Sequence, residues 1–269
     1  SAEKTVCTFV VAPTNVFGMR ALDWIQAWHL EQRKVFTADV GDSWNFNDRA
    51  LATLLLRLFE HRKRVVILSG DIHYSSAICV DYENVRSGDR ANLVQFTSSA
   101  IKNEETLTQV LHTRLKDWLL PERSRQWIGW SDPPDMREVK AAQTKNQSQT
   151  QKGADWRCEM RWLVRSPARP VEIPSTLSAL IPPHEQPAVP LLAWLKFWRA
   201  RWFQEGREVV GVNNIALVYF QQTLPSDSMR LTDTATVSKI SQSSELTVRQ
   251  QHYWFSPWLP TQVVRSWFE

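Results

Sequence analysis

The sequence predicts an α/β sandwich built around a mixed β-sheet. Two observations carry this prediction: strand-like and helix-like segments alternate over residues 1–100, and that region closes on a β-hairpin. The composition agrees. Hydrophobic residues make up 43% of the 269 residues and charged residues 22%, which is typical of a globular protein and excludes wholesale disorder, collagen and coiled coil.

The first predicted elements are a strand, a helix and a second strand. Residues 4–11 (KTVCTFVV) are rich in β-branched side chains and end before Pro13, which predicts a buried strand. Apolar residues then recur at helical spacing over residues 22–28. Residues 34–39 (KVFTAD) predict the second, shorter strand.

The next helix is predicted from its apolar stripe and from both of its ends. The stripe consists of Leu51, Leu54, Leu55 and Leu58. Asn47 or Asp48 can accept the free amide hydrogens at the start, and the basic run at residues 61–64 complements the negative end of the helix dipole.

A buried strand and a hairpin follow this helix. Residues 64–71 (RVVILSGD) form a continuous apolar run that is typical of a strand buried on both faces. Residues 76–82 (SAICVDY) and 91–96 (ANLVQF) predict two more strands, joined by a polar turn.

The second half of the chain shows a less regular order of elements. A helix is predicted from residues 103–105 to Pro121, and the polar stretch 131–153 is predicted to be an exposed loop. Residues 155–164 predict a strand, and the proline-rich stretch 167–187 an extended connection.

The last predicted elements are a tryptophan-rich helix and two strands. The helix spans residues 191–203 (LLAWLKFWRARWF), and the strands span residues 207–220 and 246–255. No internal repeat accompanies these elements.

Charge and cysteine usage restrict the class of protein further. The net charge is +4, with a pI near 9.0, but the basic residues form no long block and no nucleic-acid-binding motif is present. No apolar stretch reaches the length of a transmembrane span, and residues 1–11 do not have the layout of a signal peptide. An odd count of three cysteines without CxxC spacing favours a reducing compartment, hence the cytoplasm.

The strongest chemical signal is the segment VVILSGDIHYSSA. A strand that ends in Gly70 and Asp71, with His73 two residues later, presents a carboxylate and an imidazole from one turn. Such a turn can supply ligands to two metal ions. The alternative interpretation is that Asp71 caps the following turn and that His73 is an ordinary polar residue with satisfied hydrogen bonds.

This segment and the residues before it resemble the PhoD-like phosphatases of the calcineurin-like metallophosphoesterase superfamily. Those proteins carry an Asp-x-Trp segment, an Arg at the head of a Leu-rich helix, and a strand that ends in Gly-Asp-x-His. The matching residues are Asp42, Trp44, Arg49, Gly70, Asp71 and His73. The resemblance continues in residues 94–105 (VQFTSSAIKNEE) and is faint in the two last predicted strands.

The resemblance implies a sandwich of two mixed β-sheets flanked by helices, incomplete in this chain, that hydrolyses phosphate esters with two divalent or trivalent metal ions. Asp71 and His73 would then be the catalytic metal ligands, and Asp42, Trp44 and Arg49 would lie at the rim of the substrate site.

The resemblance also implies a division of the chain. Residues 1–105 would form the carboxyl-terminal half of the metallophosphoesterase-like domain. Residues 106–190 would be a helix followed by a polar and proline-rich insertion, and residues 191–269 the tryptophan-rich helix and closing strands, packed on the same domain.

The other ligand motifs of the superfamily do not stand upstream of Asp71, so the site is expected to be partial. Three explanations are open. This chain, which begins at Ser1 without Met, is the carboxyl-terminal part of a larger phosphatase whose remaining ligands come from an amino-terminal segment or second chain. It is a relative that has lost catalysis, or it binds one metal through Asp71 and His73 with Asp39, Asp42 or His29. We favour the first.

The predicted helix at residues 191–203 provides a different functional hypothesis. Trp194, Trp198 and Trp202 share one helical face, which is typical of a core-packing stripe. Flanking basic residues also fit a helix that contacts a partner or a membrane surface. The alternative function is therefore an interaction module.

Overall fold

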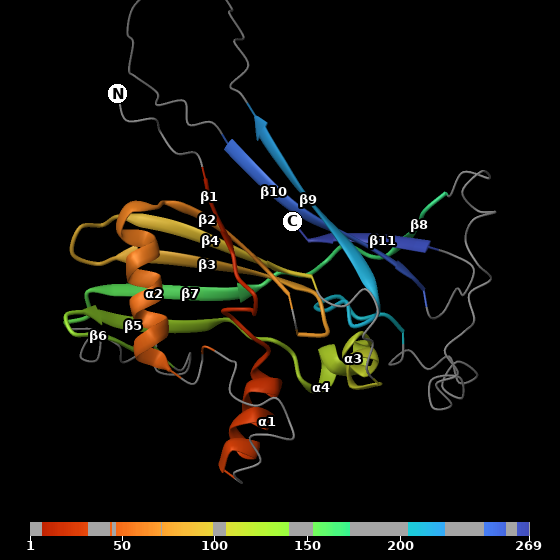
Figure 1. The fold of residues 1–269 in the computed structure, drawn as a ribbon, viewed down its shortest axis with the longest axis horizontal. Helices are drawn as coiled ribbons and strands as arrows, with labels where there is room; N and C mark the ends of the chain where they lie inside the picture. The colour runs from red at the N-terminus through yellow and green to blue at the C-terminus, as the bar shows by residue number, and fades with distance from the viewer. Residues whose placement is uncertain are drawn as a thin grey trace, which may run out of the picture.

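The computed structural model shows a mixed α/β fold that consists mostly of strands (Figure 1). The residues that the structure describes are 7–31, 44, 47–70, 72–98, 106–139, 153–172, 204–223, 245–256 and 263–268. They form a seven-stranded mixed sheet, a four-stranded antiparallel sheet and a few helices.

The larger sheet has the strand order β1-β2-β4-β3-β7-β5-β6. Its strands are β1 (Thr8–Val11), β2 (Arg64–Ser69), β3 (Ser76–Asn84), β4 (Arg90–Thr97), β5 (Arg125–Ser131), β6 (Pro134–Val139) and β7 (Trp156–Trp162). β1, β2 and β4 run parallel, whereas the remaining pairs are antiparallel. The predicted mixed sheet and the β3–β4 hairpin are therefore confirmed.

One face of this sheet is covered by α2 (Asp48–His61). The side chain of Asn47 caps the helix by accepting a hydrogen bond from the amide of Ala50 at 3.0 Å. Leu51, Leu55 and Phe59 are buried against the strands. Local sequence thus specifies both the start of α2 and the side that it buries.

The other face packs against the four-stranded sheet, whose order is β8-β11-β10-β9. These strands are β8 (Arg169–Pro170), β9 (Asn214–Thr223), β10 (Glu245–Phe255) and β11 (Val263–Phe268). Val218, Val248 and Phe268 meet Val66 and Phe96 between the two sheets. The expectation of two mixed sheets is wrong for this sheet, because all its neighbouring strands pair antiparallel.

The polar stretch predicted to be an exposed loop contains β6 at its start. This strand pairs only with β5 and forms the edge of the sheet, so its polar side chains remain largely in solvent while Met136 is buried. An edge strand needs few apolar residues, and its pattern therefore resembled that of a loop.

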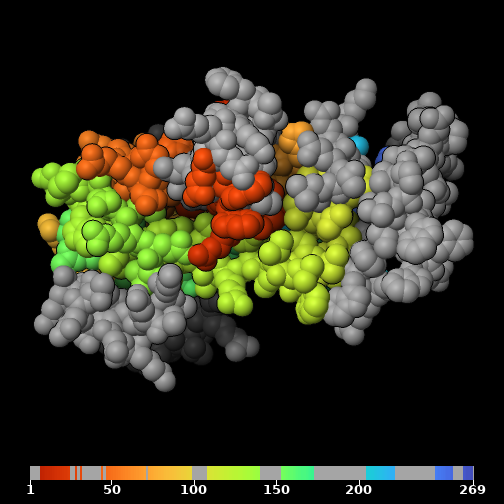
Figure 2. All heavy atoms as spheres, turned by 90° about the horizontal axis from the view of Figure 1, so that it is seen from below, coloured from red at the N-terminus to blue at the C-terminus, as the bar shows by residue number. Residues whose placement is uncertain are grey.

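The single helix predicted after residue 103 is instead two short helices, α3 (Thr106–Leu111) and α4 (Arg114–Leu119). They are separated at Thr113, whose backbone bridges to Glu205. α1 (Arg20–Glu31) confirms the first predicted helix and lies between α2 and the α3–α4 pair when the molecule is seen from below (Figure 2).

Two predicted elements lie outside the described residues, namely the strand at 34–39 and the tryptophan-rich helix at 191–203. None of the helices that the structure describes is both long and apolar enough to cross a bilayer.

Replacing Gly129 with alanine tests the packing of β5 on its neighbour β7. The added methyl carbon would lie 2.0 Å from the ring of Trp156, which is fully buried. Overpacking a rigid core of this kind should lower the free energy of unfolding by about 3 kcal/mol, measured by urea denaturation.

The matched control for this change is Gly88→Ala in the β3–β4 turn. Gly88 has a φ of 73°, but no atom lies within 4 Å of the added carbon, so the cost should be that of the backbone alone, about 1 kcal/mol. Equal losses of unfolding free energy in the two variants would show that contact with Trp156 does not determine which side chains are tolerated at position 129.

Candidate functional site

The carboxyl ends of β1, β2 and β4 meet at one edge of the large sheet, because these three strands are parallel neighbours. Ligand sites of open α/β sheets form at this edge. Here the hydroxyl groups of Ser69 and Thr97, the last residues of β2 and β4, are hydrogen-bonded at 2.9 Å. The predicted Gly-Asp-x-His segment begins directly after Ser69.

Gly70 allows the backbone after β2 to lie close to the backbone after β4. A carbon added at Gly70 would lie 3.1 Å from the carbonyl oxygen of Ser98. The amide of Ser98 also donates to the carbonyl of Ser69 at 3.0 Å. A glycine at position 70 therefore permits this close approach of the two backbone segments.

His73 has a left-handed backbone conformation, with a φ of 57°. Non-glycine residues adopt this conformation at a cost of about 1–3 kcal/mol, and such residues cluster at functional sites. The side chain of His73 is half-buried. Asp71 lies outside the described residues, so its partnership with His73 stays a prediction.

Tyr74 and Ser75, which follow His73, are each hydrogen-bonded to a different part of the chain. The phenol oxygen of Tyr74 accepts a hydrogen bond from the amide of Met19 at 3.1 Å, and burial raises the pKa of this phenol. Ser75 exchanges two backbone hydrogen bonds with Val210, at 2.8 and 2.9 Å. The turn that carries His73 is therefore fixed between the residue before α1 and the segment that leads into β9.

The loop after β1 is also fixed over this edge, by the buried side chain of Gln95. Its amide oxygen accepts hydrogen bonds from the amides of Val16 and Phe17, both at 2.9 Å. Its amide nitrogen donates to the carbonyl of Phe17 at 2.8 Å and to Thr97 at 3.2 Å. This role of Gln95 is not predictable from the sequence, since one glutamine in an apolar strand carries no distinguishing local pattern.

The predicted rim residues are not gathered at this edge by any contact among the described residues. Trp44 packs half-buried against the core. Arg49 is exposed near the start of α2, where burial and the charges of Asp135 and Glu138 raise the pKa of Asp48. Those two acidic residues belong to β6, which is the outermost strand on the opposite side of the sheet from β1.

Several other predicted site residues cannot be placed in the same way. Asp39, Asp42, Trp194, Trp198 and Trp202 lie outside the described residues, and His29 is described only as part of the α1 backbone. Within the described ranges, no group of three or more His, Cys, Asp and Glu side chains is arranged to hold a metal ion.

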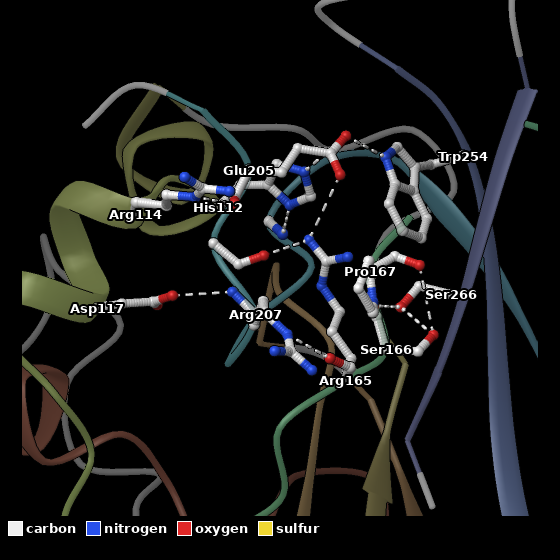
Figure 3. Close-up of polar contacts among 12 residues, drawn as sticks. His112, Arg114, Asp117, Arg165, Ser166, Pro167, Glu205, Arg207, Trp254 and Ser266 are labelled. Carbon is white, nitrogen blue, oxygen red and sulfur yellow. Dashed lines mark hydrogen bonds and ion pairs between the residues drawn. The ribbon is translucent and has the colours of Figure 1, made fainter. Parts of the chain in front are cut away.

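A second cluster of charged residues lies between α3 and the second sheet, centred on Glu205 (Figure 3). The Glu205 carboxylate lies 3.7 Å from His112 Nε2 and 3.7 Å from Arg165 Nη2, and it accepts a hydrogen bond from the indole of Trp254 at 3.3 Å. Arg165 also donates to the carbonyl of Gly206 at 2.6 Å. We call His112, Arg165, Glu205 and Trp254 the Glu205 cluster.

From its place on the helix predicted after residue 103, His112 is expected to be solvated, and the structure shows that this expectation is wrong. The residue is fully buried, and its Nδ1 accepts the amide of Gly211 at 3.1 Å, so in neutral His112 the ring proton is on Nε2, facing Glu205. Burial opposes ionisation of Glu205, but the nearby His112 and the charge of Arg165 outweigh it and hold the pKa of Glu205 below its ordinary value.

The Glu205 cluster joins distant segments of the chain. Its contacts are those of a structural cluster that fixes α3 and residues 204–212 against β10.

No protein-family model, no curated protein and no solved structure matches the chain.

Proposed function

We propose that the chain contributes to metal-dependent hydrolysis of phosphate esters of the PhoD-like type, with Asp71 and His73 as metal ligands. The observation that carries this proposal is the left-handed conformation of His73, four residues after the end of a central parallel strand. The surrounding structure holds this turn through Tyr74 and Ser75, which is the rigid support that a metal ligand requires.

The donor set of the segment is chemically suitable for metal binding. A carboxylate and an imidazole are common ligands of Zn²⁺, Mn²⁺ and iron in hydrolytic sites. When bound, such ions generate hydroxide at neutral pH and stabilise the charge that develops on the phosphoryl oxygens. Asp71 and His73 would bind and orient the ions. The hydroxyl pair of Ser69 and Thr97 lies at the ends of β2 and β4, and the segment that carries His73 follows β2 directly.

Two ligands are too few for two metal ions, so the proposal needs further donors. No group of three or more His, Cys, Asp and Glu side chains in the part of the chain that the structure describes is arranged to hold a metal ion. We therefore propose that another segment or a second chain supplies the remaining ligands. This arrangement would make the present chain a necessary, but not sufficient, half of the catalytic centre.

The test is metal binding and hydrolysis by the chain, alone and together with the sequence encoded immediately upstream. Asp71→Asn and His73→Ala should each weaken Mn²⁺ binding by about 10-fold or more, measured by calorimetry. Hydrolysis of bis(p-nitrophenyl) phosphate by the extended protein should fall in parallel.

His61→Ala is the matched control, because His61 is an exposed histidine at the end of α2. It should leave metal binding and hydrolysis unchanged. Absence of bound metal from both the short and the extended protein would refute the enzyme proposal.

A further inference from the structure

The four-stranded sheet turns one face away from the large sheet, and this outer face carries apolar and aromatic side chains. Residues alternate along β9: Val218 faces the core between the sheets, whereas Ile215, Leu217 and Tyr219 point outward and are 46–56% exposed. The register places Tyr253 of β10 opposite Ile215 on the same outer face. Apolar side chains of this size are uncommon on a surface that contacts only water.

The same face is basic. Register places Arg249 beside Tyr219, Arg265 beside Tyr253, and Arg169 beside Arg265. The guanidinium carbons of Arg169 and Arg249 lie 5.4 and 5.8 Å from the ring centre of Trp267. Arginine and aromatic side chains are therefore neighbours on this face.

The register of the described strands places no acidic residue directly opposite Arg169 or Arg265. Arg169 and Arg265 are exposed and form no ion pair within the described part of the chain. A second copy of the same face would bring like charges together, which disfavours a symmetric dimer.

We propose that this outer face binds single-stranded nucleic acid. Exposed aromatic rings and guanidinium planes stack on bases, and arginine side chains pair with phosphates. This face can therefore bind both the base and the phosphate of a nucleotide. The contributing residues come from four strands spread over residues 169–267, which explains why no local binding motif appears in the sequence. The proposal does not depend on Asp71 or His73.

Fluorescence anisotropy with a labelled 15-nucleotide DNA of mixed sequence, and with its RNA counterpart, tests the proposal. Binding should weaken as salt rises, because arginine contacts release counterions from the phosphates. Arg169→Glu should weaken binding by about 10-fold. Arg137→Glu is the matched control: its guanidinium lies 5.6 Å from the ring centre of Trp130 on the other sheet, and the net charge changes equally.

A second pair of variants separates stacking from charge. Tyr219→Ala should weaken binding by about 10-fold, whereas Tyr219→Phe, which keeps the ring, should stay within about 2-fold of the native protein. Circular dichroism checks that each variant is folded, and Tyr219 is exposed enough to be replaced without loss of core packing.

Three results would overturn the proposal: no binding of either oligonucleotide, equal losses in Arg169→Glu and Arg137→Glu, or equal losses in Tyr219→Ala and Tyr219→Phe. Vesicles that contain phosphatidylserine provide the remaining comparison. Binding to these vesicles without binding to the oligonucleotides would identify the face as a membrane contact instead.

Discussion

Arg165→Met should lower the free energy of unfolding by about 3–5 kcal/mol, because it leaves the partly buried carboxylate of Glu205 without this positive partner. Arg165 is almost completely buried, and burial lowers its pKa to about 10 despite the nearby charge of Glu205. The guanidinium also lies 4.9 Å from the ring centre of Trp254. Removing it therefore costs a hydrogen bond to Gly206 and a packed cation as well as an ion pair.

Urea denaturation of single and double variants separates these contributions. Adding Glu205→Gln to Arg165→Met removes the uncompensated charge and should restore part of the lost stability. Arg165→Lys keeps the charge but not the planar contacts, so an intermediate loss is expected.

Arg161→Met is the control for Arg165→Met, since Arg161 forms an ion pair with Asp81 on the exposed part of the sheet. It should cost less than about 1 kcal/mol. If the two arginine variants lost equal stability, burial would not explain the role of Arg165.

The protein should lose about 2 kcal/mol of stability between pH 7 and pH 5 through His252 alone. This residue is fully buried, and burial together with the charge of Arg165 lowers its pKa to about 3. Asn214 fixes the tautomer: its amide oxygen can only accept, so His252 Nδ1 donates to it at 2.8 Å. Protonation would place a second N–H on Nε2, which has no hydrogen-bond partner among the described residues.

The direction of this pH effect follows from proton uptake by the unfolded chain. Between pH 6.5 and about pH 3 the unfolded histidine holds a proton that the folded one lacks, so acid favours unfolding. The contribution of His252 is complete above pH 6.5 and is lost as the pH falls.

Denaturant titrations at several pH values measure this slope. His252→Asn preserves a donor to Asn214 and should remove the slope attributable to the histidine, even though the smaller side chain lowers stability at every pH. His61→Asn changes an exposed histidine and should leave the slope as in the native protein. An unchanged slope in His252→Asn would show that His252 is not the responsible group.

The candidate site was predictable from the sequence only as a short motif on a strand. The apolar run before Gly70 and the carboxylate and imidazole after it are local features, and the structure places this segment at the end of β2. The support for the motif was not predictable. Gln95 contacts residues 78 and 79 positions away, and Ser75 contacts Val210. Contacts at such separations have no periodic signature in the chain.

The sequence by itself determined the elements whose cause is local. Asn47 caps α2 by accepting a hydrogen bond from the amide of Ala50, three residues later, and alternation and turn residues define the β3–β4 hairpin. These features depend on residues only a few positions apart, so their pattern is visible in the printed chain.

Only the tertiary structure decided which faces became buried. β7 lies between β3 and β5 although it comes later in the chain, β6 became a strand by pairing with the edge of that sheet, and His112 became buried beside Glu205. The aromatic and basic outer face of the second sheet arises in the same way. Whether a side chain is buried depends on which other segment packs against it. That segment can be many residues away in the sequence, so the local spacing of apolar side chains does not reveal it.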